Sequence, residues 1–539
     1  MMKSMGARTG GRLILPPSLV LLLLTLFCLL APSTTIPSFA GTSSTASATN
    51  GERERVIFAT RNIYLGADVG VAMERLPNFP AAAQFMWDQV QATDFSSRAP
   101  LLAQELIATG AQVIGIQEAT TWRCRSGIFS DEIVVHDFLA ELVDVLAAKG
   151  ARFSVASVAS VDSVDSVDSV DDKPALNPGF EIAPIPYLTM VRDQERFTKI
   201  FGKERVACGF TISDALLVRD DVEVLASGTS EYSATYSIIP TLMTIYRGYA
   251  WADLRIGSST FRAITTHLES LWDPNAIPNA AVQADELIAD LKDAKMPIVL
   301  LGDFNSDPRD PRPSDEPTVN PGAQPSASTM CPAQVRAPTK ASALDSCNAY
   351  WKLIRAGFAE ISPDAQDPKY FTWGADALLA GATPARIEPS LSMDANGIFT
   401  DRLDYIFIKN GTSAVNGAIF GNQWPEGLGT WRCMAPEQVL LTGEGAAAMG
   451  KRLPEVAEGR CLPSDHAGIA GAADLAAGEF RDPPLPERAR SPFTFWRIAG
   501  AGMAILLTLS VVLLLRRRRA RRASFNEGAS GLGVSGPGE

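Results

Sequence analysis

The sequence predicts an α+β sandwich followed by one C-terminal transmembrane helix. Some apolar strand segments are separated by helical segments and others follow one another closely, which disfavours a regular βαβ alternation. With 539 residues, 46% of them hydrophobic, the chain is long enough for one large or two ordinary domains with a sizeable core. Near the C-terminus, Ile498–Leu515 is an uncharged, mostly apolar run of 18 residues, about 27 Å long as a helix, which is close to the hydrocarbon thickness of a bilayer.

Both ends of the chain carry predicted targeting segments. A basic start, the apolar run Leu13–Leu30 and the small residues Ser38 and Ala40 predict a signal peptide over residues 1–40. At the other end, six arginines within residues 516–522 follow a helix predicted over residues 496–515, and the positive-inside rule places the basic tail 516–539 in the cytoplasm. We therefore expect a secreted protein anchored in the cell membrane, with its domain outside the cytoplasm. A sorting tail that is cut off after export is the open alternative.

Between these ends we expect a flexible Ser/Thr/Ala/Gly-rich leader over residues 41–54 and one domain over residues 55–475. Apolar runs predict strands that begin or lie at Arg55–Leu65, Gln112–Gln117, Asp214–Val218, Thr244–Leu254, Phe261–Thr266, Pro297–Leu301 and Leu403–Ile408. Periodic segments predict helices over Ala81–Gln91, Ala99–Thr109, Asp131–Lys149 and Val282–Ala294. Ser130 is the expected N-cap of the third helix, and Gly150 lies just past its end.

Two segments of the domain are interpreted as loop insertions. In residues 157–180 a Ser-Val-Asp triplet is repeated four times. Spaced acids occur in calcium loops, but this repeat lacks the loop glycine and closing glutamate of an EF-hand, so a low-complexity expansion is favoured. Residues 306–346 are Pro/Ser-rich and too long for an ordinary connection. The Pro-rich residues 476–495 are expected to form a short stalk to the membrane.

Charge limits the partners of the domain. The formal net charge of the chain is −12, but the basic residues of the two ends leave 38 bases against 58 acids between residues 41 and 495. A body with a net charge of −20 is a poor non-specific nucleic-acid binder, because affinity for phosphates comes mainly from lysine and arginine. Nucleic acid is therefore expected only as a substrate, where a bound divalent cation inverts the local field. We expect a monomer.

Cysteine usage fits a location outside the cytoplasm. Removal of the signal peptide takes Cys28 and leaves six cysteines, none in a Cys-x-x-Cys pair, so a thiolate zinc site or a redox motif is disfavoured. Six cysteines predict up to three disulfides with 15 possible pairings. Our preferred local closures are Cys331–Cys347 and Cys433–Cys461.

The three histidines differ in their surroundings. His136 lies among acids in a predicted helix and is best interpreted as a surface helix residue. His267 ends the strand Phe261–Thr266, and His466 lies beside a turn. Catalytic groups favour strand ends and loops on a rigid scaffold, so His267 and His466 are the candidates for chemistry.

Polar residues occur at the ends of other predicted strands. Asn62 follows the first strand, Glu118 follows the second, and Asp303 and Asn305 follow the strand Pro297–Leu301. Asp404 interrupts an apolar strand, where a carboxylate needs a partner. A single residue of this kind is most often a cap or a turn former. Five separate strand ends that each present Asn, Asp, Glu or His indicate a shared site.

These residues resemble the endonuclease/exonuclease/phosphatase superfamily, which has the deoxyribonuclease-I-like fold. The matching pieces occur in the order of that superfamily over residues 56–475, and they are Arg61–Gly66, Ile116-Gln117-Glu118, Thr266-His267-Leu268, Gly302-Asp303-Phe304-Asn305, Arg402–Tyr405 and Ser464-Asp465-His466. Each motif is weak alone, but the ordered set is specific. The resemblance implies a four-layered α/β-sandwich, in which two sheets are flanked by helices and the site lies at one edge.

The resemblance also implies roles for these residues. Glu118 would be the main ligand of a Mg²⁺ or Mn²⁺ ion, with Asn62 beside it and Asp465 completing or flanking the site. Asp303 would orient and deprotonate the attacking water, while Asn305 and His267 would hold phosphoryl oxygens. His466, supported by Asp404, would stabilise the transition state or act as acid and base. Such a division suits in-line attack on a phosphoester, which needs a placed water, neutralised charge and help for the leaving oxygen.

The leading hypothesis is a metal-dependent phosphoesterase, more specifically a phosphodiesterase. A nuclease, a phospholipid headgroup phosphodiesterase and a small-phosphoester phosphatase remain open as substrate classes. The membrane anchor favours the second, and the lack of an obvious Lys/Arg cluster disfavours the first. A non-catalytic surface binding module that retains the fold is the alternative function, and it predicts decay at one or more of these polar positions. A purely structural surface protein would leave the five polar strand ends unexplained.

Overall fold

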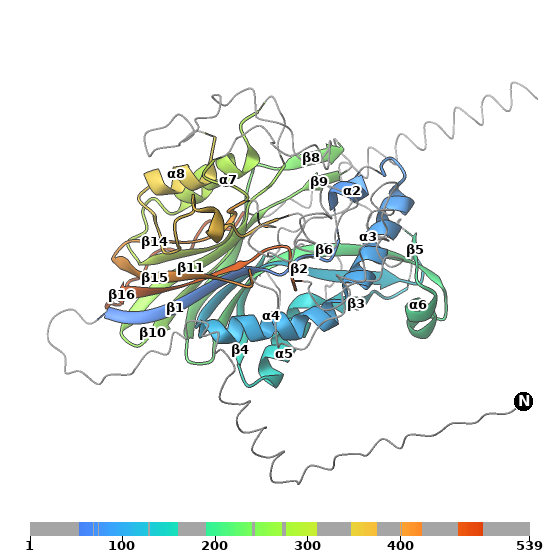
Figure 1. The fold of residues 1–539 in the computed structure, drawn as a ribbon, viewed down its shortest axis with the longest axis horizontal. Helices are drawn as coiled ribbons and strands as arrows, with labels where there is room; N and C mark the ends of the chain where they lie inside the picture. Colours follow the sequence, from blue (N-terminus) through green and yellow to red (C-terminus); the bar gives the residue numbers. More distant parts are fainter. Residues whose placement is uncertain are drawn as a thin grey trace, which may run out of the picture. The chain divides into compact units, whose positions relative to one another are not determined.

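The computed structural model describes residues 53–67, 69–73, 75–127, 130–159, 190–239, 243–271, 276–309, 347–374, 399, 401–422 and 462–488. These residues build two large mixed β-sheets with helices, so the predicted α+β sandwich is confirmed (Figure 1). The predicted signal peptide, the membrane helix and most of both insertions lie outside the described residues. Within the described part of the chain, no helix is long and apolar enough to cross a membrane.

The first sheet contains both the N-terminal strand and the last strand of the described chain. Its strand order is β15-β16-β1-β2-β6-β4, with β3 on β2 and β5 on β6. The strands are β1 (Arg53–Asn62), β2 (Val113–Arg125), β3 (Ile133–Asp137), β4 (Phe153–Ala159), β5 (Met190–Arg192), β6 (Arg205–Arg219), β15 (Thr412–Phe420) and β16 (Gly468–Ala476). Because β1 and β2 are parallel, their carboxyl ends lie at the same edge.

The second sheet has the order β13-β14-β12-β11-β10-β7. Its strands are β7 (Glu223–Glu231), β10 (Gly248–Ile256), β11 (Ser259–His267), β12 (Ile298–Asp303), β13 (Ala359–Glu360) and β14 (Asp404–Lys409). Here β11 and β12 are the parallel pair. A separate two-stranded sheet of β8 (Tyr236–Ile239) and β9 (Met243–Ile245) is inserted between β7 and β10.

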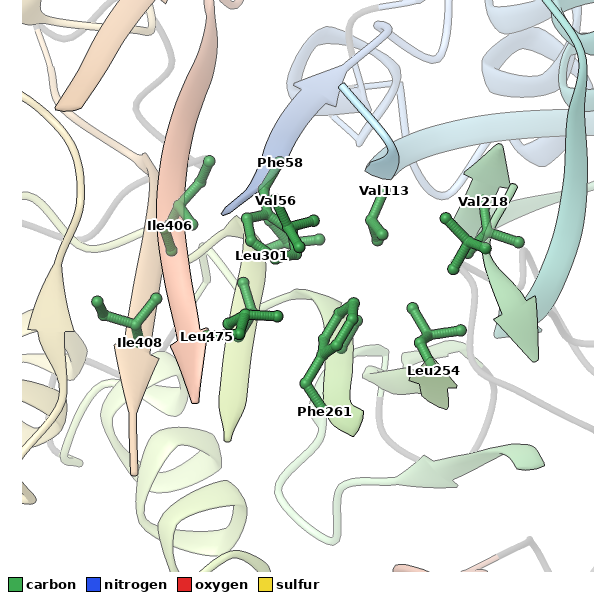
Figure 2. Close-up of a cluster of buried hydrophobic side chains, with 14 of the residues drawn as sticks. Val56, Phe58, Val113, Val218, Leu254, Phe261, Leu301, Ile406, Ile408 and Leu475 are labelled. Carbon is green, nitrogen blue, oxygen red and sulfur yellow. The ribbon is translucent and has the colours of Figure 1, made fainter. Parts of the chain in front are cut away.

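The main core lies between the two sheets. The side chains of Val56, Val113 and Val218 of the first sheet face the second sheet, from which Leu254 and Phe261 point toward them (Figure 2). All five are fully buried. Full burial of such side chains stabilises the fold by roughly 1.5–3 kcal/mol each, so this cluster fixes how the sheets face each other.

Helices pack against both sheets. Helices α4 (Phe95–Thr109) and α5 (Phe138–Ala148) pack against each other and against strands of the first sheet, next to α3 (Phe79–Thr93). Helices α7 (Asn279–Asp290) and α8 (Ala349–Arg355) cover the second sheet through a further cluster of buried residues. The short helices α2 (Val69–Met73) and α6 (Gln194–Phe201) lie in the connections.

The prediction of a helix over Asp131–Lys149 is wrong for the residues before Phe138. Residues 133–137 form β3, and α5 begins only at Phe138, where the Asp137 side chain accepts a hydrogen bond from the Ala140 amide. The run Ile133-Val134-Val135 is β-branched and therefore favours a strand, so Ser130 is not the N-cap. His136 is consequently a half-buried strand residue and not a surface helix residue.

Several other predicted boundaries also differ from the structure, and β6 begins nine residues before the predicted Asp214. The strand predicted over Thr244–Leu254 is divided into β9 and β10, because Tyr246 and Arg247 lie in the connection. The helix α7 begins three residues before the predicted Val282 and ends at Asp290 rather than Ala294. Strand β2 continues past Glu118 to Arg125, well beyond the predicted end at Gln117.

A disulfide joins Cys124 of β2 to Cys208 of β6, which are direct partners in the ladder. Cys347 is also disulfide-bonded. The bond between Cys124 and Cys208 fits the expectation of oxidised cysteines. The preferred closures Cys331–Cys347 and Cys433–Cys461 both involve cysteines outside the described residues.

Candidate active site

The predicted site residues meet at one edge of the two sheets, as the two parallel pairs require. Asn62 ends β1, His267 ends β11 and Asp303 ends β12. Asp404 begins β14, which is antiparallel to β12, so it reaches the same edge. His466 lies two residues before β16 begins at Gly468. The sheet topology thus collects these polar side chains in one place.

At this edge, a close contact joins β11 to β12, and a pair of hydrogen bonds joins the two sheets. A Cβ on Gly302 would lie 2.0 Å from the carbonyl oxygen of Thr266, so only glycine allows β12 to approach β11 here. Between the sheets, the Gln117 amide accepts a hydrogen bond from Thr60 at 3.1 Å and donates one to Thr265 at 2.8 Å. The glutamine of the Gln-Glu motif therefore links the two sheets directly beneath the site.

The centre of the site is a row across the second sheet. Ladder pairing places His267 opposite Asp303, and Asp303 opposite Asp404. The imidazole of His466 lies between the two carboxylates, with Nδ1 2.9 Å from Asp404 Oδ2 and Nε2 3.5 Å from Asp303 Oδ2. Asn62 Nδ2 donates to Asp303 Oδ2 at 3.1 Å. The predicted pairing of His466 with Asp404 is present in this geometry.

Burial and charge set the protonation of this row. Burial alone would lower the pKa of His466, but the carboxylates of Asp404 and Asp303 raise it to about 10. Burial raises the pKa of Asp303 to about 7, against the opposing effect of His466. At neutral pH the site therefore holds an imidazolium next to a carboxyl group that is close to its own titration point. This is a suitable arrangement for proton transfer near neutral pH.

His267 differs from His466 in charge. Its Nε2 lies 3.5 Å from Asp303 Oδ2, and its Nδ1 lies 4.0 Å from Asp214 Oδ1. Burial lowers the pKa of His267 well below its usual value, and the positive charges of Arg247 and His466 lower it further. His267 is therefore neutral, so it offers one N–H donor and one acceptor to a bound group.

Glu118 and Asp465 form the acidic side of the site. Glu118 has a φ of 63° at an irregularity in the ladder between β2 and β6, and its Oε2 accepts a hydrogen bond from the Leu65 amide at 2.8 Å. Burial raises the pKa of Asp465 to about 6, and the negative charge of Glu118 adds to this effect. The rise is opposed by His466 and by Arg98. Like charges held together in this way indicate a place for a cation.

Two buried arginines fix the segments that carry Asn62 and His466. Arg61 donates to the carbonyl oxygen of His466 and to Glu105 at 2.8 Å. Arg98 donates to four carbonyl oxygens, those of Thr93, Ile63, Tyr64 and Pro463. The Ser464 hydroxyl adds a bond of 2.8 Å to the Asn62 carbonyl. The end of β1 and the Ser-Asp-His segment are therefore held as one unit.

Asn305 lies at the rim of the row. Its backbone has a φ of 43°, its amide N–H donates to Asp303 Oδ1 at 2.9 Å, and its side-chain Nδ2 donates to the Leu268 carbonyl at 2.7 Å. The side chain thus joins the loop after β12 to the loop after β11. In this arrangement the Asn305 amide nitrogen is committed to the Leu268 carbonyl, so its predicted role of holding a phosphoryl oxygen stays a prediction.

Two sets of donors could hold a metal ion. Among the described residues, Asp303, Asp404 and His466 place one ligand atom each within 4.8 Å of one another. However, a protonated imidazole is not a metal ligand, and His466 is hydrogen-bonded to Asp404. The predicted set of Glu118, Asp465 and Asn62 offers carboxylate and amide oxygens, which suit Mg²⁺ or Mn²⁺. We favour this second set.

The structure adds three residues that the sequence analysis did not assign to the site. Asp214 accepts a hydrogen bond from the Glu118 amide, and burial raises its pKa to about 8. Arg247 carries a charge that acts on Asp214 and on His267, and its Nε lies 3.3 Å from Glu269. Arg98 holds the backbone as described above. A signal existed only for Asp214, as a buried acid at the start of a predicted strand.

No protein-family model and no curated protein matches the sequence. Among solved structures, the chain is similar to an endonuclease/exonuclease/phosphatase from Beutenbergia cavernae, with a TM-score of 0.39 and 15% identity over 78% of this chain and 72% of that chain. The Beutenbergia protein carries the name of the superfamily that the motifs of this chain resemble.

Two further solved structures are enzymes with more specific names. A mannosyl-6-phosphatase from Bacteroides thetaiotaomicron has a TM-score of 0.35 and 12% identity, covering 77% of this chain and 98% of that chain. TDP2 from D. rerio, complexed with a single-strand DNA product, has a TM-score of 0.35 and 11% identity, covering 78% and 98%. Because these TM-scores and sequence identities are low, conclusions about the chemistry of this chain rest on its own residues and not on these structures.

Proposed function

We propose that this protein is a metal-dependent phosphoric ester hydrolase, and that its preferred reaction is hydrolysis of a phosphodiester. The observation that supports this most strongly is the position of His466 between Asp404 and Asp303, at 2.9 and 3.5 Å, in a row that also contains His267. A buried imidazolium between two carboxylates has little structural value by itself, because desolvation of the charges costs several kcal/mol.

In this proposal each residue has a distinct role. Asp303, which is next to both histidines, accepts the proton of the attacking water. The imidazolium of His466 donates a hydrogen bond to the developing negative charge, and Asp404 stabilises its charge and fixes the ring orientation through Nδ1. His267 is neutral and donates a hydrogen bond to a phosphoryl oxygen without adding charge. Asn62 orients Asp303 through their bond of 3.1 Å.

A Mg²⁺ or Mn²⁺ ion would be held by Glu118, Asp465 and Asn62, and when bound it would neutralise phosphoryl charge and act as a Lewis acid. The pKa of Asp465 is raised mainly by burial and in part by the negative charge of Glu118, and a bound cation would relieve both effects. Arg98 opposes this rise in part but is fully buried and committed to backbone carbonyls.

We further propose that the catalytic domain lies outside the cytoplasm, anchored by the predicted helix 496–515. The predicted signal peptide and the basic tail favour this location, as does the disulfide between Cys124 and Cys208. The substrate is a phospholipid headgroup, a nucleic acid or a small phosphodiester, and the net charge of −20 disfavours a long polyanion.

A non-catalytic binding module is the second candidate function. Such a module would keep the fold and lack one or more of the groups that catalysis needs. One observation favours it: the side-chain nitrogen of Asn305, which is predicted to hold a phosphoryl oxygen, already donates to the Leu268 carbonyl. However, none of the eight polar residues predicted from the motifs is replaced, and seven of them lie together at one edge of the sheets, with Asn305 at the rim.

The test is a turnover assay with the full chain in detergent micelles. A soluble phosphodiester, duplex DNA and a choline phospholipid are each offered with Mg²⁺ and then with a chelator. We expect Mg²⁺-dependent turnover of at least one substrate and its loss in His466→Ala. Absence of turnover on all three substrates, together with no Mg²⁺ binding by calorimetry, would instead support the binding module.

A further inference from the structure

The chain after the last strand does not leave the domain as a free stalk. Residues 477–488, here called the strap, begin at the edge opposite the site, where the Gly478 amide donates to the Ser258 carbonyl at 3.0 Å. Asp482 then accepts from the amides of Lys295 and Met296, just before β12 begins at Ile298. The strap thus starts in the turn between β10 and β11, at the far end of the second sheet.

The strap then crosses the second sheet on the side that carries α7. Arg262 Nη2 donates to the Pro483 carbonyl at 3.0 Å, and the Leu485 side chain is buried in the same cluster as Tyr249 and Leu287. At its end, the Glu231 amide donates to the Arg488 carbonyl at 3.1 Å, and the Arg488 side chain pairs with Asp290 of α7. Only Leu485 contributes a large apolar side chain to the buried cluster.

The end of the strap is level with the catalytic row. Glu231 pairs with Gly248, and Tyr249 pairs with Thr266, so Glu231 and Gly248 lie level with His267. His267 in turn pairs with Asp303. Neighbouring strands are about 4.8 Å apart. Two spacings separate β7 from β11, and Arg488 lies one further spacing beyond β7, so it is roughly 15 Å along the sheet from His267. The strap therefore carries the chain from the far edge to the catalytic edge.

Because the strap is bound to the second sheet, the site must lie closer to the predicted membrane helix than a free stalk would allow. Seven residues separate Arg488 from Trp496, the first residue of the predicted membrane helix. A fully extended chain spans at most about 3.6 Å per residue, so Arg488, which is level with the catalytic edge, can lie at most about 30 Å from the start of that helix. A free stalk of the whole segment 476–495 would allow about 70 Å and would leave from the opposite edge.

The surface next to the strap suits close approach to lipid. The body of the chain has a net charge of −20, which anionic lipids would repel. In contrast, residues 234–246 contain no Asp, Glu, Lys or Arg, and they form the β8–β9 hairpin that leaves the sheet at Tyr232 and returns at Arg247. Ile277, in the loop before α7, is 37% exposed at the same edge.

We propose that the strap holds the catalytic edge toward the membrane that carries the anchor, and that the substrate is the phosphoester of a phospholipid headgroup in that membrane. The proposal rests on the proposed function and on the predicted membrane helix. In the reaction, the water oxygen bonds to phosphorus, the bond from phosphorus to the leaving oxygen breaks, and the proton of the water passes through the site to that oxygen. A fixed, short tether keeps such a substrate at high local concentration.

The experiment compares two substrates on the same vesicles. The full chain is reconstituted in choline phospholipid vesicles, and the hydrolysis of the lipid and of a soluble phosphodiester is measured. One variant, Leu485→Asp, detaches the strap. A second variant inserts twenty Gly/Ser residues after Ser491, which lengthens the tether and leaves the described domain untouched. Lys352→Ala, which removes an ion pair between α8 and Asp285, is the matched control.

We expect both strap variants to lose at least tenfold in lipid hydrolysis while their turnover of the soluble phosphodiester stays within twofold of the wild type. The control should keep both rates. An unchanged lipid rate in the insertion variant, or an equal loss of both rates in it, would overturn the proposal. Turnover of the soluble phosphodiester without any lipid hydrolysis by the wild type would overturn the substrate assignment alone.

A distance measurement separates failure of this proposal from failure of the proposed function. Fluorophores are attached at Ile277→Cys, at the catalytic edge, or at Asp220→Cys, in the turn after β6 at the far edge. Energy transfer to acceptor lipids should be stronger from position 277, even if the wild type hydrolyses nothing, and lengthening the tether should reduce the difference. Equal or stronger transfer from position 220 would show that the strap does not orient the site.

Discussion

Arg98 shows how a single buried side chain can position a site that it does not touch. It is fully buried, and its guanidinium donates to the carbonyl oxygens of Ile63 and Pro463, each at 2.8 Å. Burial lowers its pKa to about 10, so it stays charged at neutral pH. Because these carbonyls flank Asn62 on one side and Asp465 on the other, Arg98 sets the distance between two predicted metal ligands.

We therefore expect Arg98→Lys to lower the free energy of unfolding by about 2–4 kcal/mol, because lysine cannot reach four carbonyl groups and leaves some of them buried without a donor. Turnover should fall mainly through kcat. Urea unfolding and steady-state kinetics measure the two effects. Arg55→Lys, at an exposed pair with Asp474, is the control and should change neither quantity. Unchanged stability of Arg98→Lys would contradict this role.

Glu118 is the predicted main ligand of the metal ion, so its substitution tests metal binding. Without a cation, its charge contributes to the raised pKa of Asp465. A divalent ion that binds only the folded state at ten times its Kd adds about 1.4 kcal/mol of stability. We expect Mg²⁺ to raise the melting temperature of the wild type by a few degrees, chelator to reverse the shift, and Glu118→Gln to abolish it. Glu223→Gln, at an exposed pair with Arg255, should keep the full shift.

At the scale of elements, the outer halves of β2 and β6 form an arm with β3 and β5 that extends past Glu118. Its inner cluster contains Trp87, Trp122 and Phe197, with ring centroids 5.1 and 4.8 Å from Trp87. His136 of β3 lies 5.6 Å from Trp87 and next to Arg196. Burial, and then the charge of Arg196, lowers the pKa of His136 to about 3.

This histidine should make the fold sensitive to acid. Between pH 6.5 and 3 the unfolded chain binds a proton at His136 that the folded chain does not bind, so stability falls as the pH drops through this window. The loss should reach at most about 2 kcal/mol by pH 5. His136→Gln should flatten the curve in this range, as measured by urea unfolding at several pH values. An identical pH dependence in the variant would show that His136 is charged in the folded state.

The disulfide of the same arm has a separate consequence. Cys124 and Cys208 are separated by 84 residues, and cross-links of this span stabilise folded proteins by about 2–4 kcal/mol. The double variant Cys124→Ala/Cys208→Ala should lose stability in this range when unfolded in urea. Alkylation of the unfolded wild type without reductant should label neither cysteine. Labelling of both would mean that the bond does not form.

At the scale of the whole molecule, the sequence predicts the strands that carry the site better than it predicts β3 and the chain after β16. The sequence predicts strands such as β1, β2, β11 and β12 because their short apolar runs end in polar residues. The same polar residues then converge on one edge, since β1–β2 and β11–β12 are parallel pairs. The placement of Asn62, His267 and Asp303 therefore followed from strand ends alone.

Other parts could not be derived in this way. In the structure Asp214 lies in the middle of β6 and not at a strand end, and it reaches the site because it lies opposite the irregularity in β2 at Glu118, whose amide donates to it. The β-branched residues before His136 also fit the apolar pattern of the helix that follows them, so the sequence predicts a helix where the structure has β3. The Pro-rich strap has the composition of a stalk, and its position depends on hydrogen bonds to Thr260, Arg262 and Glu231, which are more than 200 residues away in the chain.

One measurement tests the central claim most directly. The rate of hydrolysis of a soluble phosphodiester by the full chain is followed with Mg²⁺, after chelation and after Mg²⁺ is restored, in the wild type and in Asp303→Asn. We predict turnover that depends reversibly on Mg²⁺ in the wild type and a loss of at least a thousandfold in the variant, which should keep its melting temperature because a buried carboxyl with a pKa near 7 gives up little charge. Equal turnover in Asp303→Asn, or turnover that survives chelation, would contradict the account.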